Sequence, residues 1–141
     1  MEKALLKCNA APLPSGRYPV ALHREAAADL LDCFCDIFSA ETAQKGLSLL
    51  AGKEGEAVAA PCVTLLDDPH LPGAAASRPF DDEGVATYRK AVVENGTLQT
   101  LLHNLKTARK AGVTSTGNAA KGGISAPCWW PPATCISARG I

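Results

Sequence analysis

An asparagine–glycine pair in the second half of the chain is the feature that most restricts the fold. Residues 85–102 read VATYRKAVVENGTLQTLL, and Asn95-Gly96 divides this segment into two runs rich in β-branched and apolar residues. Asn-Gly is the favoured dipeptide of a type I′ turn, because both central residues of that turn need a positive φ. The segment therefore predicts a β-hairpin, and a hairpin commits the chain to antiparallel pairing.

Helices are predicted on both sides of this hairpin. Residues 23–38 carry apolar side chains at three- and four-residue steps, which is typical of a helix with one apolar face. The residues of this face are Ala27, Leu30, Leu31, Phe34, Ile37 and Phe38. Ser39 is a suitable N-cap for a short helical turn that Gly46 ends. Residues 104–112 predict a further short helix, with Gly112 as its left-handed stop.

Two short apolar runs complete the set of expected elements. Residues 62–68 (CVTLLDD) predict a strand that Pro69 ends, and residues 20–22 are compatible with another short strand. Together with the hairpin and the helices, they predict an α+β fold, with an antiparallel, β-rich sheet and a few helices.

Composition and charge exclude some classes of partner. Fourteen basic and fourteen acidic residues cancel within 141 residues, so nucleic acid is not an expected partner. No apolar run approaches the length of about 20 residues that a membrane helix needs. The N-terminal stretch makes a poor signal peptide. We therefore expect a cytoplasmic location, no membrane partner and six reduced cysteines.

Sequence patterns for metal and nucleophile chemistry are weak. The three histidines His23, His70 and His103 lie in separate segments, and Arg24 stands where an H-E-x-x-H motif would need its carboxylate. We interpret His23 as a polar residue at a helix start. No G-x-S-x-G elbow occurs. The stretch STGNAAKGG lacks the spacing of a phosphate-binding loop, and it predicts a flexible loop.

Cys33 and Cys35 form the closest cysteine pair. Positions two apart on a regular helix point about 200° away from each other, so these thiols are not expected to hold one ion. We expect both to be buried small apolar residues.

The stretch PFDDEGVAT places three carboxylates side by side. In an extended segment, alternation sends Asp81 and Glu83 to one side and Asp82 to the other. Two carboxylates hold a hard cation only where other oxygens complete the shell. The residues alone leave two interpretations open, a binding role or a hairpin entrance with solvated charges that pair with Arg89 or Lys90.

Several motifs follow one another in a fixed order. They are KGLS, GKEG, DDP, DDEG with a threonine three residues on, the glycine turn of the hairpin, TARK and STGN. This ordered set, over residues 17–120, resembles the TldD/PmbA family of bacterial and archaeal proteins.

The resemblance implies a role in peptide breakdown. Family members are similar to a two-subunit cytoplasmic peptidase, in which a TldD-type subunit carries a zinc-binding His-Glu-x-x-x-His helix and a later cysteine ligand. The other subunit, PmbA or TldE, lacks this motif and helps to form the substrate chamber. The implied substrates are unfolded peptides, including a microcin-type peptide antibiotic and an antitoxin.

The implied place of the zinc motif, counted back from KGLS without gaps, is Leu31 to Asp36, which contains no histidine. The chain therefore resembles the PmbA/TldE type, with no catalytic residue, no metal and no cofactor of its own, and zinc is expected only in a TldD-type partner. The residues of the matching motifs that we expect to line a substrate cleft or to act structurally are Asp81, Asp82, Glu83, Gly84, Thr116, Gly117 and Asn118.

Three segments are expected from this resemblance. Residues 1–16 are a remnant helix (at 2–8) with a linker, and residues 17–120 are part of the domain that resembles the family's catalytic region. Residues 121–141 are an irregular tail with both tryptophans, which we attribute by hypothesis to a frameshift near Pro127. Because family members are far longer, we expect an incomplete fragment of a larger domain.

Three functional hypotheses remain open at this point. The first is a non-catalytic PmbA/TldE-like component of a metallopeptidase complex. The second is an independent hydrolase that uses the acidic triplet or a thiol. The third is a non-functional truncated fragment, since a sheet that lacks neighbouring strands is marginally stable.

Overall fold

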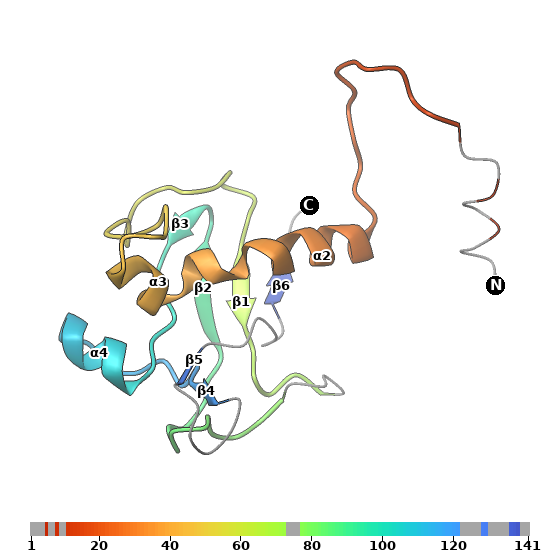
Figure 1. The fold of residues 1–141 in the computed structure, drawn as a ribbon. Helices are drawn as coiled ribbons and strands as arrows, with labels where there is room; N and C mark the ends of the chain where they lie inside the picture. Colours follow the sequence, from red (N-terminus) through yellow and green to blue (C-terminus); the bar gives the residue numbers. More distant parts are fainter. Residues whose placement is uncertain are drawn as a thin grey trace.

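The computed structural model describes residues 5, 8, 11–72, 77–121, 128–129 and 136–138. At its centre lies a four-stranded sheet in the order β3-β2-β1-β6, and a second, two-stranded sheet joins β4 to β5. The strands are β1 (Leu65–Asp67), β2 (Lys90–Glu94), β3 (Thr97–Leu98), β4 (Ala120–Lys121), β5 (Cys128–Trp129) and β6 (Ile136–Ala138). Every strand pair is antiparallel, which confirms the predicted α+β class (Figure 1).

The β2–β3 hairpin forms around the predicted turn. Asn95 and Gly96 have φ values of 49° and 81°, as a type I′ turn requires. A Cβ atom at Gly96 would lie 2.5 Å from the carbonyl oxygen of Ala59, so this position excludes any side chain. The residues next to the turn pair in the expected register, with Val93 opposite Leu98.

The helices begin at the predicted signals, and α4 also ends at its predicted stop. They are α2 (Arg24–Phe34), the 3-10 turn η1 (Cys35–Phe38), α3 (Ala40–Gln44) and α4 (Leu105–Ala111). His23 caps α2, since its Nδ1 accepts the N–H of Glu25 at 3.4 Å, and Ser39 caps α3. Gly112, with φ 72°, ends α4 in the left-handed conformation. The interpretation of His23 as a helix-start residue is confirmed.

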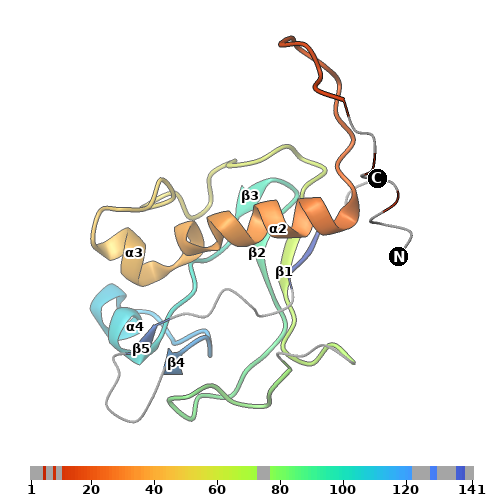
Figure 2. The ribbon, with the colours of Figure 1, turned by 45° about the vertical axis from the view of Figure 1, so that its right-hand side comes forward.

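The predicted helix at 23–38 differs from the structure in two respects. The α-helix stops at Phe34, whose φ of −106° and ψ of 1° lie outside helical values, and η1 continues the chain. The predicted apolar face is only partly covered, since Leu30 and Phe34 are 50% and 55% exposed. One side of α2 faces the sheet (Figures 1 and 2). No described part of the chain forms a layer over its other side.

The hydrophobic core lies between the sheet and the η1–α3 region. Leu98 and Val93 are the most deeply buried large side chains, with 0% and 1% exposed. The remaining buried members of this cluster are Cys35, Phe38, Ala40, Leu50, Leu65, Val92, Leu101 and Leu102. Leu31 and Ile37 are partly buried against it, so α2 and η1 contribute one edge of the core.

Residues 11–22 run away from the rest of the chain before α2 begins (Figures 1 and 2). Every residue in this segment is exposed, and the strand expected at residues 20–22 does not form. Its backbone lacks a partner strand within the described residues, which is the physical reason. One local contact shapes the segment, a 2.9 Å hydrogen bond from the Tyr18 hydroxyl to the carbonyl oxygen of Pro14.

The two ends of the chain are described only in part. The helix expected at residues 2–8 lies outside the described residues apart from Leu5 and Cys8, and so do residues 122–127, 130–135 and 139–141 of the tail. Within the tail, the expectation of no regular structure is wrong for β5 and β6. Strand β6 pairs with β1 along all its three residues. Among the described residues, no helix has the length and apolar character to cross a membrane.

Candidate functional site

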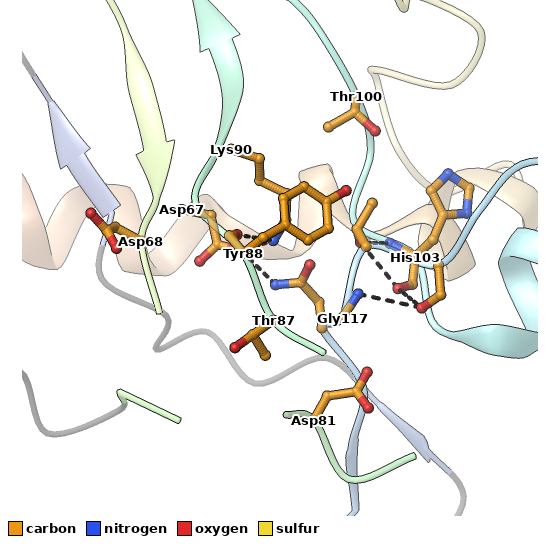
Figure 3. A network of polar contacts seen from close by, with 12 residues as sticks. Asp67, Asp68, Asp81, Thr87, Tyr88, Lys90, Thr100, His103 and Gly117 are labelled. Atoms are coloured by element: carbon orange, nitrogen blue, oxygen red, sulfur yellow. Dashed lines mark hydrogen bonds and ion pairs between the residues drawn. The ribbon is translucent and has the colours of Figure 1, made fainter. Parts of the chain in front are cut away.

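Two opposite charges face one another across β1 and β2. The chain register places Asp67 at the end of β1 opposite Lys90 at the start of β2, and their side chains are only 2% and 6% exposed. Lys90 Nζ lies 2.7 Å from Asp67 Oδ2. Figure 3 shows the two side chains pointing toward each other beside the Tyr88 ring. Both charges have lost most of their water, so only close contact with each other and with further hydrogen-bond partners can stabilise them.

Further polar contacts complete this arrangement. Asn118 donates from Nδ2 to the same Asp67 Oδ2 at 2.7 Å. Lys90 Nζ also donates to the Tyr88 carbonyl at 3.2 Å and lies 4.6 Å from the Tyr88 ring centroid, a cation–π distance. We call Asp67, Lys90 and Asn118 the buried triad. It ties the predicted STGN loop to the first two strands of the sheet.

The acidic triplet forms a turn and not an extended strand. The turn is closed by an antiparallel bridge between Phe80 and Ala86. Asp81 is 2% exposed, and its Oδ1 accepts the backbone N–H groups of Glu83 at 3.0 Å and Val85 at 2.9 Å. Its Oδ2 accepts the N–H of Ala119 at 3.0 Å. Asp81 therefore holds its own turn closed and fastens it to the residue after Asn118.

The other two carboxylates bind neighbouring segments. Asp82 Oδ2 accepts the N–H of Lys121 at 2.7 Å, and its Oδ1 lies 3.3 Å from a guanidinium nitrogen of Arg78. Glu83 Oε2 accepts the N–H of Leu105, the first residue of α4, at 2.7 Å. A free N–H in the first turn of a helix is a favourable partner for a carboxylate. The triplet thus connects its turn to α4 and β4.

The expectation of solvated charges paired with Arg89 or Lys90 is wrong. Arg89 lies 3.5 Å from Asp68, and Lys90 lies against Asp67. The three side chains do not alternate between two sides, because the backbone turns back on itself between Phe80 and Ala86. Its carboxylate oxygens accept N–H donors, and this is not the environment of a cation, which needs oxygens free to coordinate it.

The STGN loop packs against the backbone that leads into α4. Thr116 Oγ1 accepts the N–H of His103 at 2.7 Å, and the Thr116 N–H donates to the His103 carbonyl at 3.2 Å. Burial lowers the pKa of His103, and the Thr107 backbone and the charge of Glu54 oppose this effect only in part. The imidazole is therefore kept neutral near pH 7.

The structure brings most of the predicted site residues together. Asp81 accepts the N–H of Ala119, the residue after Asn118, and Gly117 packs on the backbone of Ala86 and Thr87. Asp67 and Lys90 were not predicted as members of the site. The available signal was an acidic residue at the end of one apolar run and a basic residue at the start of another, since a charge at the edge of a buried strand is rarely left unpaired.

Gly117 is required by both backbone conformation and space. Its φ is 69°, and an added Cβ atom would lie 2.8 Å from the Ala86 carbonyl oxygen. We expect Gly117→Ala to lower the free energy of unfolding by about 2–4 kcal/mol, as the sum of left-handed strain and a clash with backbone. Urea denaturation followed by circular dichroism measures this change.

Gly84 supplies the matched control for this substitution. It has a φ of 78° but nothing within 4 Å of an added Cβ atom. Gly84→Ala should cost only the conformational part, about 1 kcal/mol. Equal losses for the two variants would contradict the close packing of the loop against Ala86.

The place of the implied zinc motif spans the end of α2 and the start of η1. Cys33 is exposed and Cys35 is buried, so the expectation that both thiols are buried is wrong for Cys33. Burial, followed by the charges of Asp32 and Asp36, raises the pKa of Cys35 to about 11. A thiol held protonated and facing away from its neighbour is a poor zinc ligand. These residues therefore do not fit a zinc site.

The described residues contain no cluster of three or more histidine, cysteine, aspartate or glutamate side chains arranged to hold a metal ion. Asn118 reaches a small cavity lined by the polar residues Ser39, Glu41, Asn104 and Thr107 together with Leu102, whose volume of about 10 Å³ suits about one water molecule. It is far smaller than a small-molecule pocket.

The raised pKa of Cys35 predicts a loss of stability at alkaline pH. The unfolded thiol has a pKa near 9.0 and the folded thiol about 11, so between these values the unfolded state has released a proton that the folded state retains. The contribution of the Cys35 thiol to the free energy of unfolding is complete below pH 9. It falls by about 2–3 kcal/mol as the pH rises to 11. Urea denaturation at several pH values, compared with Cys35→Ala, isolates this contribution. An equal decline in both proteins would contradict it.

Comparison with known proteins places the chain in a family. Residues 15–139 match the family model described as the PmbA/TldA metallopeptidase C-terminal domain, a range that includes most of the tail set apart above. A protein named metalloprotease from Archaeoglobus fulgidus is 38% identical over 120 residues, which are 84% of this chain and 28% of that protein.

Two solved structures share the fold. One is a candidate DNA gyrase modulator from Thermotoga maritima, which is 49% identical and has a TM-score of 0.82 over 93% of this chain and 29% of that one. The other is TldE from Thermococcus kodakarensis, 34% identical with a TM-score of 0.66 over 73% of this chain and 24% of that one. This chain thus spans about a quarter of the length of these relatives. It belongs to the PmbA/TldD family, as a match to its metallopeptidase C-terminal domain.

Proposed function

We propose that this chain is a non-catalytic, PmbA/TldE-like component of a cytoplasmic metallopeptidase complex of the TldD/PmbA type. In this proposal, a TldD-type partner supplies the zinc and the bond-breaking groups. The substrates are unfolded proteins and peptides, including microcin-type peptides and antitoxins that are processed by proteolysis. This chain contributes subunit pairing and part of the wall of a peptide channel.

The chemistry at residues 31–36 carries this proposal. The end of α2 and the start of η1 present leucine, phenylalanine, two aspartates and two cysteines that face different ways, and the sequence has no histidine between His23 and His70. A hydrolytic zinc site of the implied type needs two imidazoles on one helical face. The similarity to a structure named TldE supports the same assignment.

The acidic triplet and the STGN loop have a scaffold role in this proposal. The triplet carboxylates accept hydrogen bonds from backbone N–H groups of α4, β4 and their own turn. Asn118 and Thr116 of the loop bond to Asp67 and to the His103 backbone. They would fix the shape of the channel wall without touching the scissile bond. The same contacts give less support to the independent-hydrolase hypothesis, because each of the three carboxylates already accepts at least one backbone N–H.

Co-purification with a TldD-type subunit from the same organism tests the proposal. A tagged TldD-type subunit should retain this chain, and the pair should degrade an unfolded peptide that this chain alone leaves intact. Loss of degradation after replacing a zinc-motif histidine of the TldD-type subunit would assign the chemistry to the partner. Failure of the two chains to associate would favour the truncated-fragment hypothesis. Peptide cleavage by this chain alone, lost in Asp82→Ala, would favour the hydrolase.

A further inference from the structure

The turn of the β2–β3 hairpin contains a chemically reactive dipeptide. In Asn-Gly, the backbone nitrogen of the glycine can attack the side-chain carbon Cγ of the asparagine, because glycine has no side chain to shield that nitrogen. Asn95 is followed by Gly96, whereas Asn9, Asn104 and Asn118 are followed by larger residues. Asn95 is exposed, so water, which the later step of the reaction consumes, reaches its side chain.

The attacking nitrogen of this reaction is engaged in the folded chain. The Gly96 N–H donates to the Val63 carbonyl oxygen at 2.8 Å, the length of a well-formed hydrogen bond. The Gly96 nitrogen must lose its proton to attack, and this bond holds the proton in place. The N–H of Asn95 is held in the same way, by Thr64 Oγ1 at 3.2 Å. Both N–H groups of the turn are therefore fixed by the residues that lead into β1.

The same segment holds the carbonyl side of the turn. The Gly96 carbonyl oxygen accepts the N–H groups of Val58 at 2.8 Å and Ala59 at 3.0 Å. We call residues 57–64 the turn clamp, and Figures 1 and 2 show this part of the chain passing beside the β2–β3 hairpin on its way to β1. Attack on Cγ needs a peptide group that is free to rotate into line with it. The bonds of the turn clamp remove that freedom.

We infer that Asn95 is a latent modification site, which deamidates only when the turn clamp releases Gly96. In the released state, the Gly96 nitrogen bonds to Asn95 Cγ and the bond from Cγ to Nδ2 breaks. The proton of the Gly96 nitrogen leaves with Nδ2 as ammonia, and a succinimide ring remains. One water molecule then opens the ring at either of its carbonyl carbons, which gives aspartate or isoaspartate. Water is the one reactant besides the chain, and no oxidation state changes.

The isoaspartate product does not fit the hairpin. Its main chain passes through the former side chain, so one additional methylene enters the backbone at the turn. The turn sets the register that places Val93 opposite Leu98, and these two side chains are the most deeply buried of the core. Gly96 has no room to adjust, because even a Cβ atom would lie 2.5 Å from the Ala59 carbonyl oxygen. A chain that opens and reacts therefore does not regain its hairpin. This inference is independent of the proposed function.

Peptide mapping by mass spectrometry tests the inference on the full chain, incubated at mildly alkaline pH in buffer and in concentrated urea. Deamidation at Asn95 should be at least about tenfold slower in buffer, because only the open fraction of the folded chain reacts. Thr64→Val removes the acceptor of the Asn95 N–H. It should raise the rate in buffer about fivefold, the effect of one lost hydrogen bond on the open population, and leave the rate in urea unchanged. Thr114→Val alters an exposed threonine after α4 and should change neither rate.

Refolding of the urea-treated chain separates the longer backbone from the new charge. Aspartate and isoaspartate carry the same charge, and Asp-Gly suits the same type of turn as Asn-Gly. After dilution from urea, the natively folded fraction isolated by size-exclusion chromatography should retain chains with asparagine or aspartate at this position and be depleted of isoaspartate. Equal deamidation rates in buffer and urea, an unchanged rate in Thr64→Val, or isoaspartate chains that refold as fully as aspartate chains would overturn the inference.

Discussion

Replacing Lys90 by methionine is expected to lower the free energy of unfolding by about 3–5 kcal/mol. The substitution removes the cation that lies 2.7 Å from Asp67 and leaves a carboxylate that is 2% exposed with Asn118 as its remaining donor. The loss would be a large part of the about 5–15 kcal/mol by which a domain is normally stable. Urea denaturation at neutral pH, followed by circular dichroism, measures it.

Two further variants separate the buried charge from the loss of a lysine. Lys110→Met on the exposed side of α4 should change stability by no more than about 0.5 kcal/mol. The double variant Asp67→Leu with Lys90→Met removes both charges, and it should recover most of the stability lost in Lys90→Met. If Lys90→Met costs no more than Lys110→Met, the pair across β1 and β2 does not hold the sheet as described.

Asp81→Ala is expected to lower the free energy of unfolding by about 3–4 kcal/mol. Three backbone N–H groups, of Glu83, Val85 and Ala119, would lose their acceptor at a position that is 2% exposed, and each buried unsatisfied group costs about 1–3 kcal/mol, less than additively. Thermal and urea denaturation of the variant give this quantity.

Asp82→Ala is the control within the same triplet. The Asp82 side chain is 39% exposed, so water can replace it as an acceptor, and the expected loss is about 1 kcal/mol. Asp81→Asn keeps one acceptor oxygen but turns an amide donor toward an N–H group, so it should fall between the two. Equal losses in Asp81→Ala and Asp82→Ala would refute the clamp role of Asp81. Unchanged stability with reduced activity of a reconstituted complex would instead place Asp81 in the substrate channel.

The local features of the fold were predictable because neighbouring residues decide them. The Asn95-Gly96 turn, the Ser39 cap and the Gly112 stop depend on backbone preferences within a few residues, and all three occur where expected. His23 at the start of α2 belongs to the same class. Such signals act through local hydrogen bonds and φ values, so they need no knowledge of the rest of the chain.

The candidate site was predictable only as a set of residues. The motif order indicated Asp81, Thr116, Gly117 and Asn118, but not the partners that they would contact. Asp67 and Lys90 meet because the register of β1 on β2 places them opposite one another, and a shift by one residue would send them to opposite faces of the sheet. The burial of Cys35 and the exposure of Cys33 likewise depend on how α2 sits on the core.

By itself, the sequence determined the antiparallel α+β class, the ends of the short helices and the family to which the chain belongs. These properties follow from local backbone chemistry and from motifs that can be compared letter by letter. Only the tertiary structure decided that three adjacent carboxylates act as hydrogen-bond acceptors for α4, β4 and their own turn. The reason is that a carboxylate is stabilised by whichever donors surround it, and the donors outside the turn come from segments about 20 to 40 residues away along the chain.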